Sequence, residues 1–190
     1  MNRKTGYESF HLNRQTLNFT LLEFWQWSSS DLVSNALRGV LAEYIVGKAL
    51  GNLGDVRKEW DAYDLQTVAG IKVEVKSAAY VQSWPQTRPS TISFNIAPTL
   101  GWNAETNEYG LENKRQAEVY VFALLSYPDK TTIDPLNVDQ WEFYVLPTAI
   151  LNHEVPTQKS ISLNRLQQLA GPAVQYSDLR AMIDAFISKD

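Results

Sequence analysis

The alternation of apolar and polar positions predicts a helix, a hairpin and two further strands. The stretch SSSDLVSNALRGVLAEYIVGKALG predicts a helix from about Asp31 to Leu50, with Ser30 as the N-cap and Gly51 as the C-terminal stop. KEWDAYDLQT and IKVEVKS, joined by the turn VAG, indicate a β-hairpin. AEVYVFALLSY is nearly all apolar, which is typical of a central strand covered on both faces, and QWEFYVLP indicates another strand.

Shorter signals surround this core. TLNFTLLEFWQW is apolar and fits either a helix or a strand, and TISFNIA indicates a short strand. Two short helices are expected near SLNRLQQLAG and SDLRAMIDAFIS, each with a serine as candidate cap. The order of elements predicts an α/β fold, in the form of an α+β mixed sheet flanked by helices. We expect a single domain over residues 1–190, with its core at about 30–146 and C-terminal helices at about 160–188.

The register of the hairpin follows from its side chains. If residues 68–70 form a three-residue loop with Gly70 in the left-handed conformation, Leu65 faces Val73 on an apolar side. On the other side Asp64 then lies directly across from Glu74. Opposed carboxylates repel each other unless a cation lies between them or one of them is protonated.

A two-residue loop is the alternative. It would mix apolar and polar side chains on both faces, which burial of one face selects against, and it would place Asp61 on the face of Glu74. We therefore prefer Asp64 as the partner of Glu74 and keep Asp61 in reserve.

Composition limits the chemistry of any metal site. The chain has no cysteine, and its two histidines, His11 and His153, are far apart in the sequence. Thiolate sites are excluded and a histidine-rich zinc or iron centre is disfavoured, so the ligands of a metal would be oxygens, as Mg²⁺, Mn²⁺ or Ca²⁺ prefer. The net charge of −4 argues against a surface that coats nucleic acid indiscriminately, although a local basic groove remains compatible with it.

The N-terminal sequence MNRKTGYESFHLNRQ lacks the apolar core of a signal peptide. No apolar run reaches the length needed to cross a membrane. A cytoplasmic protein with no membrane partner is the expectation.

Glu43 is unusual within the predicted helix. Its neighbours on the same side of the helix are apolar residues or glycines, and an ionised carboxylate in such a stripe is costly unless it is paired or binds a cation. Alternatively, Glu43 lies at the margin of the packed face, where it reaches solvent or pairs with a lysine. The opposite side of the helix is also apolar, so the pattern leaves the inward face open.

These residues together resemble the pattern of the PD-(D/E)XK nuclease superfamily, which has the restriction-endonuclease-like fold. That pattern has a glutamate in the first core helix, an aspartate in a hairpin and Glu-x-Lys on the next strand. The corresponding residues are Glu43 in RGVLAEYIVG, Asp64 in WDAYDL, and Glu74 and Lys76 in VEVK. Tyr63 stands where the proline of the superfamily's name is expected.

The resemblance implies metal-dependent phosphodiester hydrolysis of DNA by an endonuclease. Mg²⁺ (or Mn²⁺) would be held by Asp64, Glu74 and the main-chain carbonyl of Val75, and Glu43 would bind a second ion or position a metal-bound water. Lys76 would orient or deprotonate the attacking water and stabilise the developing negative charge. The catalytic set would thus comprise Glu43, Asp64, Glu74 and Lys76, together with the glutamine described next.

The loop YVQSWPQTR follows the lysine strand. Gln82 resembles a glutamine that helps to order the site in several branches of the superfamily. Trp84, Gln86 and Arg88 are candidate nucleic-acid contacts through stacking, hydrogen bonding and charge, or they belong to a polar loop with one packed tryptophan. Candidate phosphate contacts, or simply solvated surface, are Arg57, Lys58, Lys114 and Arg115.

Two other kinds of function remain open. One is a catalytically silent nuclease-like domain that binds nucleic acid or a partner protein. The other is an aromatic-rich binding module, which six tryptophans and nine tyrosines would suit but which leaves Glu43 and the opposed Asp64 and Glu74 unexplained. Cutting both strands of a duplex would favour a homodimer.

Overall fold

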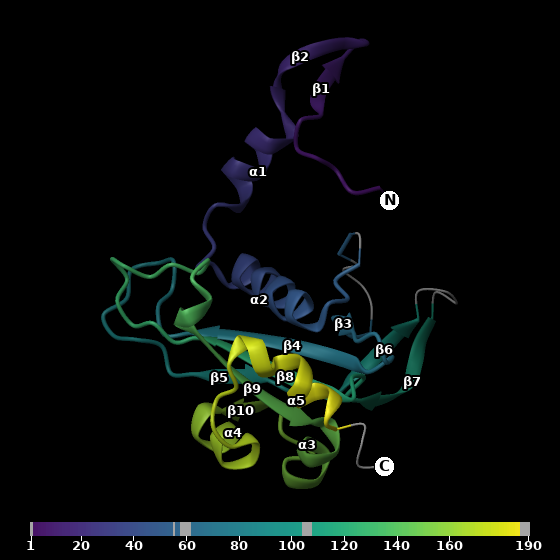
Figure 1. Ribbon diagram of the computed structural model, residues 1–190, viewed down its shortest axis with the longest axis vertical. Helices are drawn as coiled ribbons and strands as arrows, with labels where there is room; N and C mark the ends of the chain where they lie inside the picture. Colours follow the sequence, from purple (N-terminus) through teal and green to yellow (C-terminus); the bar gives the residue numbers. More distant parts are fainter. Residues whose placement is uncertain (1, 55, 58–61, 104–107, 187–190) are drawn as a thin grey trace.

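A four-stranded mixed sheet forms the centre of the computed structural model, which describes residues 2–54, 56–57, 62–103 and 108–186 (Figure 1). Its order is β3 (Leu65–Gln66), β4 (Lys72–Ala79), β8 (Val119–Leu125) and β9 (Trp141–Pro147). β4 and β8 are parallel, whereas β3 and β9 are antiparallel to their neighbours. All seven residues of β8 are buried, which confirms the central strand predicted from its apolar run.

Helices cover both faces of this sheet. α2 (Asn35–Leu50) and α5 (Leu179–Asp184) pack with the side chains of Val73, Val121 and Val145. The other face, which carries Phe122 and Tyr144, packs against α3 (Thr148–Glu154) and α4 (Leu163–Ala170). The fold is therefore a mixed α+β arrangement, as the order of elements predicted.

Helix α2 begins later than the sequence predicted. Ser30 is the C-cap of a preceding helix, a turn follows in which the N–H of Ser34 donates to the carbonyl of Asp31, and Ser34 is the N-cap of α2. Ser30 and Ser34 are both residues of a type suited to an N-cap, so residue type alone does not decide between them. The predicted end is confirmed, since Gly51 adopts the left-handed conformation with φ of 72°.

Smaller elements complete the chain. β5 (Ser93–Asn95) pairs with β10 (Ser160–Ser162), and β6 (Thr99–Asn103) pairs with β7 (Glu108–Lys114). Single 3₁₀ turns lie at η1 (Val138–Gln140) and η2 (Tyr176–Asp178). Ser162 caps α4 as expected, but the N-cap of α5 is Asp178 and not the serine before it.

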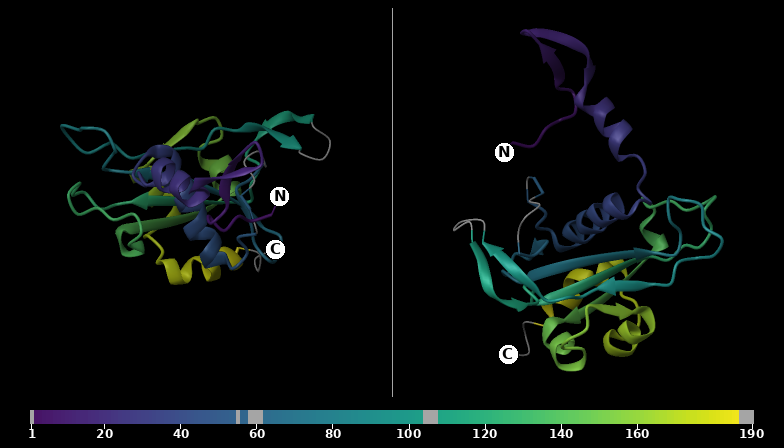
Figure 2. Two further views of the ribbon diagram at one scale, coloured as in Figure 1. Left: turned by 90° about the horizontal axis from the view of Figure 1, so that it is seen from above. Right: turned by 180° about the vertical axis from the view of Figure 1, so that it is seen from behind.

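The N-terminal arm, residues 2–30, contains β1 (Ser9–Leu12), β2 (Gln15–Thr20) and α1 (Leu21–Ser29). The apolar stretch TLNFTLLEFWQW, which fitted either a helix or a strand, contains the end of β2 and most of α1. The strand ends at Thr20, which is the N-cap of α1. Its hydroxyl accepts a hydrogen bond from the N–H of Glu23, whose carboxylate in turn accepts from the N–H of Thr20. β1, β2 and α1 stand away from the sheet and its helices in Figure 1 and in the right-hand view of Figure 2.

Among the helices in the described ranges, none combines the length and the apolar character needed to span a bilayer.

Candidate active site

The β3–β4 hairpin has the three-residue loop that its side chains predicted. Leu65 pairs with Val73, and the N–H of Thr67 donates to the carbonyl of Ile71 over 2.9 Å. Gly70 has φ of 92°, the conformation in which a residue without a Cβ is favoured. This register confirms the pairing that underlies the choice of Asp64; the reserve residue Asp61 lies outside the described residues.

Asp64 occupies the point at which β3 leaves the edge of β4. Its N–H donates to the carbonyl of Val73 over 3.2 Å. Its Oδ2 accepts a hydrogen bond of 2.7 Å from the N–H of Val75. The carboxylate thus satisfies a main-chain N–H of β4 that a longer β3 would otherwise satisfy. It is held against β4, the strand that carries Glu74 and Lys76.

The surroundings of Asp64 oppose its ionisation. Burial, followed by the charge of Glu74 and by a smaller effect of Glu43, raises the pKa of Asp64 from 3.8 to about 7. The hydrogen bond from Val75 and the charge of Lys76 act in the opposite direction but do not compensate. Asp64 therefore lies within electrostatic range of the other three charged residues of the predicted set.

Glu74 and Lys76 lie two residues apart on β4 and form an ion pair with each other. Their side chains are 17% and 31% exposed. Because side chains alternate along a strand, both point to the face opposite the one on which Val73 and Val75 pack against α2. The charge of Glu74 acts on Asp64, although the two carboxylates share no hydrogen bond.

Tyr120 is a neighbour of Glu74 that the sequence interpretation missed. It is the register partner of Glu74 on β8, and it is buried. Burial and then the charge of Glu74 raise the pKa of its hydroxyl, so the group is a neutral phenol at physiological pH. The sequence did offer one indication of this residue, since its hydroxyl is a polar group within the otherwise apolar run of β8.

Glu43 reaches the site from the α2 side of the sheet. The inward face of the helix carries Ala42, Ile45 and Val46, which places Glu43 at the margin of the packed face. Its carboxylate accepts two hydrogen bonds from Arg57, 2.5 Å from Nε to Oε2 and 2.8 Å from Nη2 to Oε1. Glu43 thus lies at the margin of the packed face and is paired, as one of the two interpretations expected, but its partner is an arginine and not a lysine.

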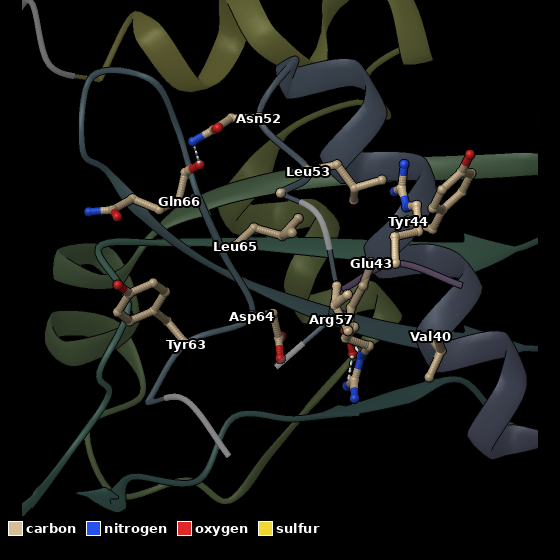
Figure 3. A pocket seen from close by; sticks show the side chains of 13 residues that line it. Val40, Glu43, Tyr44, Asn52, Leu53, Arg57, Tyr63, Asp64, Leu65 and Gln66 are labelled. Atoms are coloured by element: carbon tan, nitrogen blue, oxygen red, sulfur yellow. Dashed lines mark hydrogen bonds and ion pairs between the residues drawn. The ribbon is translucent and has the colours of Figure 1, made fainter. Parts of the chain in front are cut away.

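Glu43, Arg57 and Asp64 line one pocket of about 330 Å³, into which their side chains converge (Figure 3). The walls come from α2, from the segment after it and from the start of the hairpin, and Arg3 of the N-terminal arm also contributes. Glu43 and Asp64 thus line the same pocket, whereas Glu74 and Lys76, which point to the opposite face of β4, are not among its lining residues.

The three acids have different partners in this arrangement. Asp64 is bound by Val75, Glu74 pairs with Lys76, and Glu43 pairs with Arg57. Within the described residues, no group of three or more aspartate, glutamate, histidine or cysteine side chains is gathered as a set of metal ligands. Glu74 and Glu43 nevertheless act on Asp64 electrostatically, because the charge of each contributes to its raised pKa.

The loop after β4 is built around Gln82. Its buried amide nitrogen donates to the carbonyl of Ala79 over 2.9 Å and to Oγ of Ser90 over 3.2 Å, while its Oε1 accepts from Nη1 of Arg38 over 3.4 Å. The main-chain N–H of Gln82 donates to Gln86 Oε1 over 2.6 Å. Gln82 therefore connects the N-terminal part of α2 to the segment that follows β4.

A comparison with models of known protein families places the chain in one of them. Residues 9–165 match the model of the family described as bacteriophage T4 endonuclease IV. The chain belongs to the bacteriophage T4 endonuclease IV family. The match runs from β1 into α4 and includes Glu43, Asp64, Glu74, Lys76 and Gln82. A comparison with curated proteins gave no match.

Membership of the endonuclease IV family confirms the coarser part of the sequence interpretation, namely a nuclease of the endonuclease class. It also supports DNA as the substrate. The PD-(D/E)XK type and the metal requirement remain predictions.

The other residues that were predicted to contact nucleic acid or phosphate differ in their exposure. Trp84 and Arg88 are exposed, whereas the amide of Gln86 is bound within the loop to Ser90 and to main-chain groups. Lys114 is exposed on β7, and Lys58 lies outside the described residues.

Arg115 requires a correction, because it is neither a phosphate contact nor solvated surface. It is buried, and its guanidinium donates to the carbonyls of Ile96, Val155 and Gln158 and to Asn152 Oδ1. Its acceptors come from segments far from it in the sequence, and no local pattern revealed them.

Proposed function

We propose that this endonuclease IV family member hydrolyses DNA phosphodiester bonds with the help of a divalent metal ion, as a nuclease of the PD-(D/E)XK type. The observation that carries the proposal is the position of Asp64, whose ionisation is opposed by both Glu74 and Glu43 while the amine of Lys76 lies nearby. The order of α2, the hairpin, the parallel β4–β8 pair and β9 supports a restriction-endonuclease-like core.

Asp64 and Glu74, with the carbonyl of Val75, would hold Mg²⁺ or Mn²⁺. A divalent cation stabilises neighbouring carboxylates in their ionised form, and the raised pKa of Asp64, to which the charge of Glu74 contributes, supports this fit. When bound, the ion would polarise the scissile phosphate and neutralise charge that develops on it. Glu43, at the pocket wall, would bind a second ion or orient a water molecule.

Lys76 would act on the attacking water. Its pairing with Glu74 fixes the amine beside the carboxylates, so a water at the site can donate a proton to it or accept one from it. The ammonium form would also stabilise the negative charge of the pentacovalent phosphorus in the transition state. Tyr120, a neutral phenol beside Glu74, would supply a dipole without adding charge.

DNA would approach along the loop that follows the catalytic strand. Trp84 and Arg88 are exposed on this loop and offer a stacking surface and a phosphate contact. The loop is anchored, because Lys130 Nζ donates to the carbonyl of Trp84 over 2.7 Å. A preformed loop lowers the entropic cost of binding a strand.

The deciding experiment compares Lys76→Met with Lys72→Met. Both lysines lie on the same face of β4, but Lys72 lies over the ring of Tyr63 and its charge is outside the proposed machinery. The proteins are incubated with plasmid and with oligonucleotides in Mg²⁺, Mn²⁺ or EDTA. We expect the wild type and Lys72→Met to cut only with metal, and Lys76→Met to lose at least about a hundredfold in rate.

Cleavage in EDTA would contradict the metal requirement, and full activity of Lys76→Met would contradict the mechanism. Binding of DNA without cleavage under every metal condition would instead favour a catalytically silent nuclease-like domain. Circular dichroism of each variant shows whether the fold is retained.

A further inference from the structure

The N-terminal arm exposes its aromatic side chains. Within residues 2–30 only Gly6 is buried, and α1 buries none of its residues. Tyr7 and Trp27 are 80% and 84% exposed, and the other four aromatic residues of the arm, at 10, 19, 24 and 25, are between 36% and 46% exposed. β1, β2 and α1 project from the rest of the chain in Figure 1 and in the right-hand view of Figure 2, so the sheet and its helices do not cover this surface.

The exposure is not the result of an arm without structure. β1 and β2 pair around a turn in which Asn13 and Arg14 have positive φ. The hairpin is attached to α1, because the N–H groups of Leu21 and Leu22 donate to the carbonyls of Glu8 and Gly6 over 2.9 and 2.8 Å. The arm is therefore a defined element whose apolar side chains have no core of their own to enter, and exposed apolar surface favours burial in a partner.

The apolar area that the arm exposes is as large as one partner's share of a typical protein–protein interface. Taking about 200 Å² for a whole aromatic residue, the six aromatic side chains expose roughly 650 Å². Leu12 and Leu22, 61% and 39% exposed, bring the apolar surface to about 800 Å². A typical monomer has no patch larger than about 300–600 Å², and each partner in an interface of standard size contributes about 800 Å².

The chemistry of the arm favours a protein partner. It carries three basic residues, Arg3, Lys4 and Arg14, and two acidic ones, Glu8 and Glu23, so its net charge is only +1. A strand-binding platform would need more positive charge and free ring faces. Here Phe10 and Phe19 lie against each other with ring centroids 4.7 Å apart, and the exposed leucines have no function in base stacking.

We propose that the apolar surface of the N-terminal arm is a homodimer interface, in which the arms of two copies pack against each other across a two-fold axis. A second copy brings the same surface, so a two-fold contact covers both arms without any other partner. The arm contributes Arg3 to the pocket of Glu43 and Asp64, but none of its aromatic or leucine side chains lines that pocket. The proposal is therefore independent of the metal chemistry proposed above.

Sedimentation of the full-length protein over a range of concentrations tests this interface. We expect the wild type to sediment as a dimer. Phe24→Ser with Trp27→Ser removes two exposed side chains from each arm and is expected to raise the dimer dissociation constant by about two orders of magnitude or more. The matched control is Leu111→Ser, at a position on β7 that is 100% exposed, and it should leave the dimer intact.

A label on the arm locates the contact. The chain has no cysteine, so Asn18→Cys, at an exposed position of β2, gives a single site for a spin label. Dipolar coupling between the labels of two copies is expected and should disappear in the Phe24→Ser, Trp27→Ser background. Coupling that survives these substitutions would overturn the proposal.

Three other results would overturn it. They are a wild type that is monomeric at all concentrations, a dimer that persists in the double variant with an unchanged dissociation constant, and a monomer whose arm variants lose only oligonucleotide binding. None of them bears on metal-dependent cleavage, which is measured separately with Lys76→Met.

Discussion

The main-chain N–H of Val75 donates a hydrogen bond of 2.7 Å to Oδ2 of Asp64 and thereby fixes an acid at the open edge of β4. One donor does not offset burial and the neighbouring carboxylates, because the pKa of Asp64 still rises to about 7. β4 therefore carries Glu74 and Lys76 and also binds Asp64, whose ionisation depends on the charges of these two residues. This relationship has consequences for stability that can be measured without substrate.

Asp64→Asn is expected to stabilise the metal-free protein at neutral and higher pH. The folded pKa of about 7 lies above the value of 3.8 for a free aspartate, so the folded state keeps a proton that the unfolded chain releases between pH 4 and 7. The stability of the wild type therefore falls as pH rises through that window. The asparagine does not ionise and can still accept the hydrogen bond from Val75.

Thermal unfolding in EDTA at a series of pH values measures this effect. The melting temperature of Asp64→Asn should exceed that of the wild type by several degrees at pH 8, and the two should converge near pH 4, since the penalty is of the order of a few kcal/mol. Asp139→Asn, at an exposed position in η1, is the control and should follow the wild type. A variant less stable than the wild type at pH 8 would disprove the assignment of Asp64.

Arg57→Ala is expected to strengthen the binding of divalent ions by about tenfold. The guanidinium makes two hydrogen bonds to Glu43 and adds positive charge to the pocket that also contains Asp64. Its removal frees a carboxylate and lowers the repulsion felt by an incoming cation. Isothermal titration with Mn²⁺ measures the affinity.

Arg88→Ala removes the same charge from an exposed position on the loop after β4 and serves as the control. Equal affinities in the wild type and Arg57→Ala would show that the pair with Glu43 does not compete with the ion.

Arg115→Ala is expected to destabilise the fold by about 3–5 kcal/mol, because it deletes a buried guanidinium and leaves main-chain acceptors without a donor. Lys114→Ala, at the adjacent exposed position, should change the free energy of unfolding by no more than about 0.5 kcal/mol. Urea denaturation compares the two variants. Similar unfolding midpoints would mean that the Arg115 hydrogen bonds are not formed in solution.

The parts of the fold that the sequence predicted correctly are those governed by local patterns. The run of β8, the loop ending at Gly70 and the end of α2 at Gly51 each follow from neighbouring residues. The position of Asp64 across from the Glu-x-Lys strand followed because a change of register by one residue exchanges the two faces of the hairpin.

What the sequence did not predict depends on contacts between distant segments. Arg57 meets Glu43 from 14 residues away, and Arg115 finds acceptors up to 43 residues away. The start of α2 was misplaced because a serine suited to begin a helix, Ser30, ends another one. The arm could not be anticipated because its apolar pattern is typical of a core element, whereas the fold leaves it outside the core.

Gln82→Ala is expected to loosen the loop after β4 without unfolding the sheet. Its amide connects Ala79, Ser90 and the guanidinium of Arg38, whose pKa is already lowered by burial. Losing these bonds should cost about 1–3 kcal/mol locally, so amide hydrogens of residues 80–90 should exchange with solvent roughly tenfold faster or more. Exchange in β8 should be unchanged, and Thr87→Ala, at an exposed position of the same loop, should resemble the wild type.

Because Trp84 and Arg88 lie on this loop, the Michaelis constant of Gln82→Ala for DNA should rise as well. Faster amide exchange in the loop together with an unaltered Michaelis constant would show that the loop does not contact DNA.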